Sequence, residues 1–158
     1  MADSRLKSKA ELGFVFLWAF FDKMFGLGFA TTTDKSWVSG VSPTTGFLKF
    51  GTQGVFGPVF QSLTGNQFID LLFMLGLLCI GVSLIVGIGI KITGYSGALM
   101  MFLIYLSLLP PENNPIVDEH IIYIFLLIYF ANVPVGETLG LGNWWKNTKL
   151  VRENPWLV

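Results

Sequence analysis

The sequence predicts an all-α membrane protein, a bundle of four transmembrane helices formed by a single domain of residues 1–158. Three observations lead to this fold class. The chain is 53% hydrophobic and 13% charged, with a mean hydropathy of +0.64, whereas soluble domains usually carry about 25% charged residues. Its apolar residues gather in four segments, each near the ~20 residues that a helix needs to cross a bilayer. Its lysines and arginines are divided unequally between the two sides that these segments define.

The four predicted spans are separated by turn signals and charged residues. Because an open sheet edge cannot lie in lipid, we expect every span to be a helix. The expected spans are residues 12–29, 68–90, 92–109 and 116–136. We expect Lys91 in the tight turn between the second and third spans, and Pro110-Pro111 to end the third.

The basic residues predict the orientation of the bundle. One side holds seven of them and the other only two, Lys35 and Lys49. Since cytoplasmic loops carry the excess of basic residues, we expect a multi-pass protein of the cell membrane with both termini in the cytoplasm. The seven are Arg5, Lys7, Lys9, Lys91, Lys146, Lys149 and Arg152.

Residues 30–66 form the one long connection, which we call the lid and expect on the outer side. Apolar residues recur within it at helical spacing, from Val55 to Leu63 and around Pro58. This pattern indicates a short interfacial or re-entrant helix at the outer mouth of the bundle.

Composition excludes several classes of function. The formal net charge is zero, so nothing favours a nucleic-acid partner, which requires a basic patch. Cys79 is the only cysteine and His120 the only histidine, so we expect no disulfide, bis-histidine haem, iron–sulfur centre or other metal centre. Any electron transfer would therefore need a bound organic molecule or a cofactor held by a partner.

The most unusual feature is the adjacent pair Asp22-Lys23 inside the first span. A charged side chain in mid-membrane costs roughly 2.5–3.5 kcal/mol, so intramembrane charge is a functional hypothesis by default. We expect Asp22 to face the bundle interior near His120 or Glu119, because a carboxylate beside an imidazole suits proton transfer near neutral pH. Lys23 lies about 100° away around the helix and would snorkel or pair with an acid of another helix.

Each of the other polar residues also has a structural interpretation. Asp118 and Glu119 follow Asn114-Pro115, so they could stabilise the start of a helix through its dipole. Asp70 could be a first-turn acid at the water interface, and His120 an interfacial histidine. In the second span, small residues at three- and four-residue spacing predict close helix packing, with Cys79 as a packing residue. They are Gly76, Cys79, Ser83 and Gly87.

Several strings resemble the DoxX/DoxD-like membrane proteins: Phe16-Leu-Trp-Ala-Phe-Phe-Asp-Lys-Met-Phe-Gly-Leu-Gly-Phe29, Gly40-Val-Ser-Pro-Thr-Thr-Gly-Phe47, Asn114-Pro-Ile-Val-Asp-Glu-His120 and Leu139-Gly-Leu-Gly-Asn-Trp-Trp145. The resemblance covers nearly the whole chain and implies a four-helix integral membrane protein. Some members of the family are linked to thiosulfate:quinone oxidoreductase, in which the membrane subunit works with a smaller subunit. The positions carried over by motif match are Asp22, Lys23, Ser42, Pro43, Gly46, Asp118, Glu119 and His120.

Three functions compete on this reading. In a quinone-linked oxidoreductase subunit, a quinone would stack on Trp18 or Phe21 and exchange protons with Asp22 and His120. Glu119 is a further candidate catalytic residue, and the further candidate cofactor-binding residues are Lys23, Asp118 and Ser42. In a scaffold or accessory subunit, the charged residues would be structural. A small-molecule or lipid-binding bundle is the third. The expected partners are the lipid bilayer and either other membrane subunits or further copies of this chain.

Overall fold

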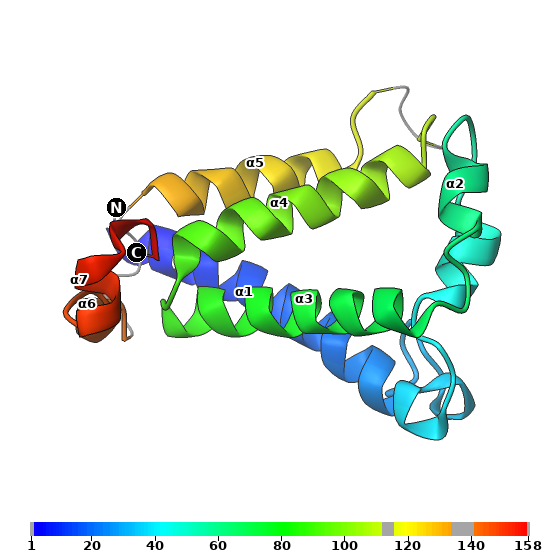
Figure 1. The fold of residues 1–158 in the computed structure, drawn as a ribbon, viewed down its shortest axis with the longest axis horizontal. Helices are drawn as coiled ribbons and strands as arrows, with labels where there is room; N and C mark the ends of the chain where they lie inside the picture. The colour runs from blue at the N-terminus through cyan, green and yellow to red at the C-terminus, as the bar shows by residue number, and fades with distance from the viewer. Residues whose placement is uncertain (1, 112–115, 134–140, 158) are drawn as a thin grey trace.

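The computed structural model describes residues 2–111, 116–133 and 141–157, and within these ranges the secondary structure is entirely helical (Figure 1). Four longer helices form the body of the molecule. They are α1 (Ala2–Phe25), α3 (Gln67–Val86), α4 (Ile90–Ser107) and α5 (Glu119–Asn132). The all-helical part of the predicted fold class is therefore confirmed.

The helices associate as two pairs. Helix α1 packs along α3, α4 packs along α5, and the contact between α3 and α4 joins the pairs. In Figure 1 the pairs lie close together at the end that carries both termini and spread apart towards the lid. We call these the terminal end and the lid end of the bundle.

Two helices are long and apolar enough to cross a membrane, α3 and α4. Helix α5 is apolar but has only 14 residues. Helix α1 has the length, but Lys9, Glu11, Asp22 and Lys23 interrupt its apolar sequence. The two helices that meet both criteria are those whose predicted spans were nearly free of charge.

Glycines move two predicted boundaries. Helix α1 ends at Phe25, before the expected residue 29, because Gly26 adopts φ +67° and turns the chain. Gly87 and Gly89, with φ +86° and +61°, form the turn between α3 and α4. Lys91 was expected in this turn, but it lies in the first turn of α4.

The close helix contacts use other small residues than predicted. A Cβ atom on Gly81 would lie 2.6 Å from Leu17 Cγ, and one on Gly94 would lie 2.6 Å from Ala131 Cβ. These two glycines permit the contacts of α3 with α1 and of α4 with α5. Of the predicted stripe, Gly76 packs towards Met100 of α4, whereas Cys79 is exposed.

The lid is a chain of short helical turns across the lid end (Figure 1). It contains η1 (Thr33–Lys35), η2 (Trp37–Ser39), η3 (Phe47–Gly51) and α2 (Gly57–Gln61). Helix α2 lies within the stretch where the apolar spacing predicts a short helix. Several apolar side chains of this region are exposed, with Val55 at 87% and Val59 at 62%.

The C-terminal segment folds against the terminal end and consists of α6 (Gly142–Lys146), α7 (Lys149–Glu153) and η4 (Pro155–Leu157). Leu141 N donates to Val86 O at 2.9 Å, which fixes the segment to the end of α3. Trp145 Nε1 donates to Leu157 O at 2.8 Å and closes the segment on itself. We call residues 141–157 the hook.

Candidate functional site at the lid end

Asp22 is almost completely buried, with 2% of its surface exposed. After α1 the chain reverses at Gly26, whose N–H donates to Asp22 O at 2.8 Å and whose carbonyl accepts from Thr33 Oγ1 at 3.0 Å. The reversal brings Phe29 N to within 3.3 Å of Asp22 Oδ1. Asp22 Oδ2 is buried and has no hydrogen-bond partner in the described part of the chain. The carboxyl group therefore keeps one oxygen free for a proton or a ligand.

Aromatic residues lie near Asp22 along the chain. Trp18 lies one turn before Asp22, and its ring meets the Phe29 ring edge to face at 5.1 Å between centroids. Trp18 is 37% exposed and Phe21 is 40% exposed. Phe21 stacks with Phe25 at 6.2 Å. The expected cofactor-binding rings are thus accessible, and the Trp18–Phe29 pair lies on the same turn of chain as the buried carboxyl group.

A second buried acid lies at the start of α3. Asp70 is 4% exposed, so it is not the water-facing first-turn acid that the sequence suggests. Its Oδ1 accepts hydrogen bonds from Ser42 Oγ at 2.8 Å and from Thr44 Oγ1 at 2.5 Å. Ser42 Oγ in turn accepts from the N–H and the hydroxyl of Thr45, at 3.1 and 2.9 Å. Ser42, expected in a cofactor site, instead attaches the lid to α3.

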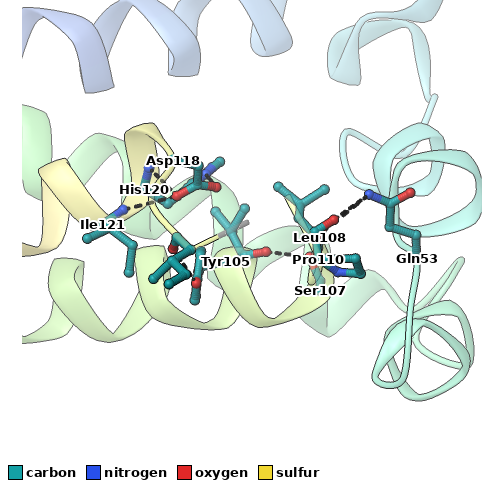
Figure 2. Close-up of polar contacts among 10 residues, drawn as sticks. Gln53, Tyr105, Ser107, Leu108, Pro110, Asp118, His120 and Ile121 are labelled. Carbon is teal, nitrogen blue, oxygen red and sulfur yellow. Dashed lines mark hydrogen bonds and ion pairs between the residues drawn. The ribbon is translucent and has the colours of Figure 1, made fainter. Parts of the chain in front are cut away.

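The acidic cluster before α5 is organised as a helix cap (Figure 2). Asp118 Oδ1 accepts from the N–H groups of His120 and Ile121, at 3.0 and 3.2 Å. Its Oδ2 lies 2.9 Å from His120 Nδ1, and the two side chains are 11% and 16% exposed. Glu119 is exposed. Ligand atoms of Asp118, Glu119 and His120 lie within 4.8 Å of one another, but the capping bonds already account for the position of Asp118.

The structure does not join Asp22 to the α5 cluster. Among the described residues, no hydrogen bond or ion pair links Asp22 to His120 or Glu119. Asp22 belongs to the α1–α3 pair and His120 to the α4–α5 pair, and the lid ends of α1 and α5 lie apart in Figure 1. Lys23 is half-buried and follows Asp22 around the helix. The expected carboxylate–imidazole site is therefore two separate groups, a buried acid on α1 and a capped histidine on α5.

The lid also contacts the end of α4 through Gln53 (Figure 2). The backbone N–H of Gln53 donates to Ser107 O at 2.9 Å, and its side-chain Nε2 donates to Pro110 O at 3.1 Å. Gly54, with φ +67°, comes so close to Leu109 that a Cβ atom there would lie 1.7 Å from Leu109 O. The lid thus bridges the two helix pairs, a role that its apolar spacing did not predict.

No family model, curated protein or solved structure matches this chain. The resemblance to DoxX/DoxD-like proteins accordingly stays a prediction, carried by the strings quoted above.

Proposed function

We propose that this chain is a membrane-embedded subunit of DoxX-like type that binds a lipid-soluble quinone beside Trp18 and exchanges protons with it through Asp22. One observation carries the proposal: the buried Asp22 has a carboxyl oxygen without a hydrogen-bond partner among the described residues, and it lies one helical turn from Trp18, whose exposed ring meets that of Phe29. A quinone has a flat ring, which stacks on aromatic side chains, and carbonyl oxygens that accept protons on reduction.

The proposal includes a four-helix bundle in the membrane. Helices α3 and α4 supply two spans by length and composition. Helix α5 covers about 21 Å at 1.5 Å per residue, part of the ~30 Å of a full span. Helix α1 presents an exposed apolar stripe that suits lipid. The stripe consists of Phe14, Trp18, Phe21 and Phe25. The positive charge at the terminal end favours a cytoplasmic position for both termini.

The chemistry assigned to the chain is limited to binding and proton exchange. Reduction of a quinone to a quinol takes two electrons and two protons. In this proposal Asp22 exchanges protons with the quinone oxygens, while the electrons come from a reduced sulfur compound, directly or through the second subunit that the resemblance implies. His120 takes no part in this step, because Asp118 holds its ring at the start of α5.

The proposal is tested with the full chain in nanodiscs, by equilibrium binding of a short-chain quinone at several pH values. Loss of the ring in Trp18→Leu weakens binding about tenfold, since an aromatic contact contributes on the order of 1 kcal/mol. Phe125→Leu, which removes an exposed ring of α5, is the matched control and retains binding.

The acid is tested in the same system by Asp22→Asn, with Asp118→Asn as the control because asparagine preserves a helix cap. We expect Asp22→Asn to bind quinone but to lose quinol formation when the electron donor and partner are supplied. Equal binding by the wild type and Trp18→Leu, or unchanged turnover in Asp22→Asn, would refute the proposal.

A non-catalytic accessory subunit is the second candidate. It is favoured by the structural use of two acids, since Asp118 caps α5 and Asp70 holds the lid. A stoichiometric membrane partner that copurifies, with no quinone in the extract, would support this function over the first.

A further inference from the structure

Lys9, like Asp22, is a buried charged side chain with an atom that has no hydrogen-bond partner among the described residues. It is 2% exposed, and its Nζ has no hydrogen-bond partner among the described residues. Lys9 shares the core-facing side of α1 with Leu12 and Phe16, which are 5% and 4% exposed. It lies at the terminal end, 13 residues before Asp22, so it belongs to a different region from the quinone site proposed above.

An unpaired ammonium group in an apolar interior is strongly unfavourable. Removing it from water costs several kcal/mol unless an opposite charge and hydrogen bonds compensate. Burial accordingly lowers the pKa of Lys9 from its ordinary value. The amine must therefore lose its proton or bind an anion. The charges at the same end of the bundle favour the second alternative.

Several other basic residues lie at the terminal end of the bundle. Arg5 lies one turn earlier on the same side of α1, is exposed, and forms no ion pair with a described residue. The hook, which folds against this end, carries further positive charge (Figure 1). Its basic residues are Lys146, Lys149 and Arg152. Such a region attracts anions, and a guanidinium one turn from an ammonium provides a planar fork and a point charge for one ligand.

We propose that Lys9 and Arg5 form a binding site for a phosphate group at the terminal end. The ligand is either the headgroup of an anionic phospholipid or free phosphate, since both present the same tetrahedral anion. The hook is fixed by the hydrogen bond from Leu141 to Val86 and by Val151, which is 2% exposed.

The site is tested by thermal unfolding of the full chain with two probes. Inorganic phosphate is added to the protein in detergent, and nanodiscs of phosphatidylglycerol are compared with nanodiscs of phosphatidylcholine. At a ligand concentration about 100 times Kd, the Tm of the wild type rises by on the order of 5 °C. A shift with phosphate identifies the free ion, and one with phosphatidylglycerol alone identifies a lipid headgroup.

Variants show whether Lys9 is responsible. Lys9→Met removes the shift, Arg5→Gln reduces it about tenfold in apparent affinity, and Lys91→Met, an exposed lysine of the same end, leaves it unchanged. If Lys9→Met does not fold, the Tm shift of Arg5→Gln is compared with that of Lys91→Met, and this comparison tests the site. No shift in the wild type, or an equal shift in Lys9→Met or Arg5→Gln, overturns the proposal.

An internal acid is the competing partner for Lys9. Glu137 lies outside the described residues and is tested by mutation. If Glu137→Gln lowers the Tm of the wild type but not that of Lys9→Met, a carboxylate of the chain neutralises Lys9 and the proposal is overturned. Independent effects of the two substitutions support an external anion.

Discussion

Substitution of Gly81 by alanine tests the packing of α1 on α3 directly. The added Cβ atom would lie 2.6 Å from Leu17 Cγ, 2.8 Å from Leu17 N and 3.0 Å from Gly13 O. Favourable contacts between heavy atoms need about 3.5–4.0 Å. Two of these three neighbours are backbone atoms, which cannot move by changing a rotamer. The helices must therefore separate by about 1 Å at this contact.

The cost follows from two opposing terms. Overpacking in a close contact typically destabilises a protein by about 1–3 kcal/mol. Alanine has a higher helix propensity than glycine by about 1 kcal/mol, which offsets part of this loss. We expect Gly81→Ala to lower the free energy of unfolding by about 1–2 kcal/mol. Gly97→Ala should cost less, because its nearest neighbours are side-chain atoms of Ile80 and Leu127 at 3.1–3.3 Å.

The measurement is equilibrium unfolding in mixed detergent micelles, followed by far-ultraviolet circular dichroism. Gly46→Ala is the matched control: its Cβ atom would meet nothing within 4 Å, and its backbone is right-handed helical, with φ −60°. Alanine at such a position is neutral or stabilises by about 0.4–1 kcal/mol. If Gly81→Ala is as stable as Gly46→Ala, the close approach of α1 and α3 is refuted.

Three further predictions concern the polar groups. Thr44→Val removes a hydroxyl donor to the buried Asp70, so amide hydrogen exchange in the lid should become faster while α4 stays protected. Unchanged exchange in the lid would contradict the conclusion that Asp70 holds the lid on α3. Asp118→Ala should lower the free energy of unfolding by about 0.5–2 kcal/mol, and Asp118→Asn should lower it by less because asparagine is also a good N-cap. Equal losses in the two variants would show that the N-cap hydrogen bonds do not stabilise α5. Without added anion, the stability of the wild type relative to Lys9→Met should rise with pH. This sign follows because the pKa of Lys9 is lower in the folded protein than its ordinary 10.5, so the unfolded chain binds more protons between the two values. A pH titration of unfolding in which the difference stays flat would show that Lys9 is paired.

Local sequence patterns predicted the helices well where packing did not compete. The apolar stretches that became α3 and α4 were identified because they are long and nearly free of charge. Their ends were misplaced because a hydropathy pattern does not register the left-handed conformation of Gly87. A structural role of Asp118 at a helix start was one of two interpretations, since a dipole effect depends only on position in the helix. The hydrogen bonds by which Asp118 caps α5 were not predicted.

Contacts between distant residues could not be predicted from these patterns. Asp70 and Ser42 are separated by 28 positions, and no periodicity in either segment reports that they meet. The small-residue stripe around Cys79 included the close contact at Gly76 but missed the one at Gly81 for a related reason. A stripe of small residues shows only that a second helix can approach closely. The close contact forms at Gly81 because Gly13 lies opposite it on α1.

The lid is attached to the two helix pairs by different chemistry. Towards α3 its acceptor is the carboxylate of Asp70, and Phe29, directly before the lid, donates to the carboxylate of Asp22 on α1. Gln53 instead donates to backbone carbonyls at the end of α4. Protonation weakens a carboxylate as an acceptor but leaves a carbonyl unchanged, so proton exchange at Asp22 would affect only the first attachment. Asp22→Asn therefore alters proton exchange and lid attachment together, while Thr44→Val alters attachment alone. Quinol formation that fails in the first variant and persists in the second would assign the chemistry to the Asp22 carboxyl group itself.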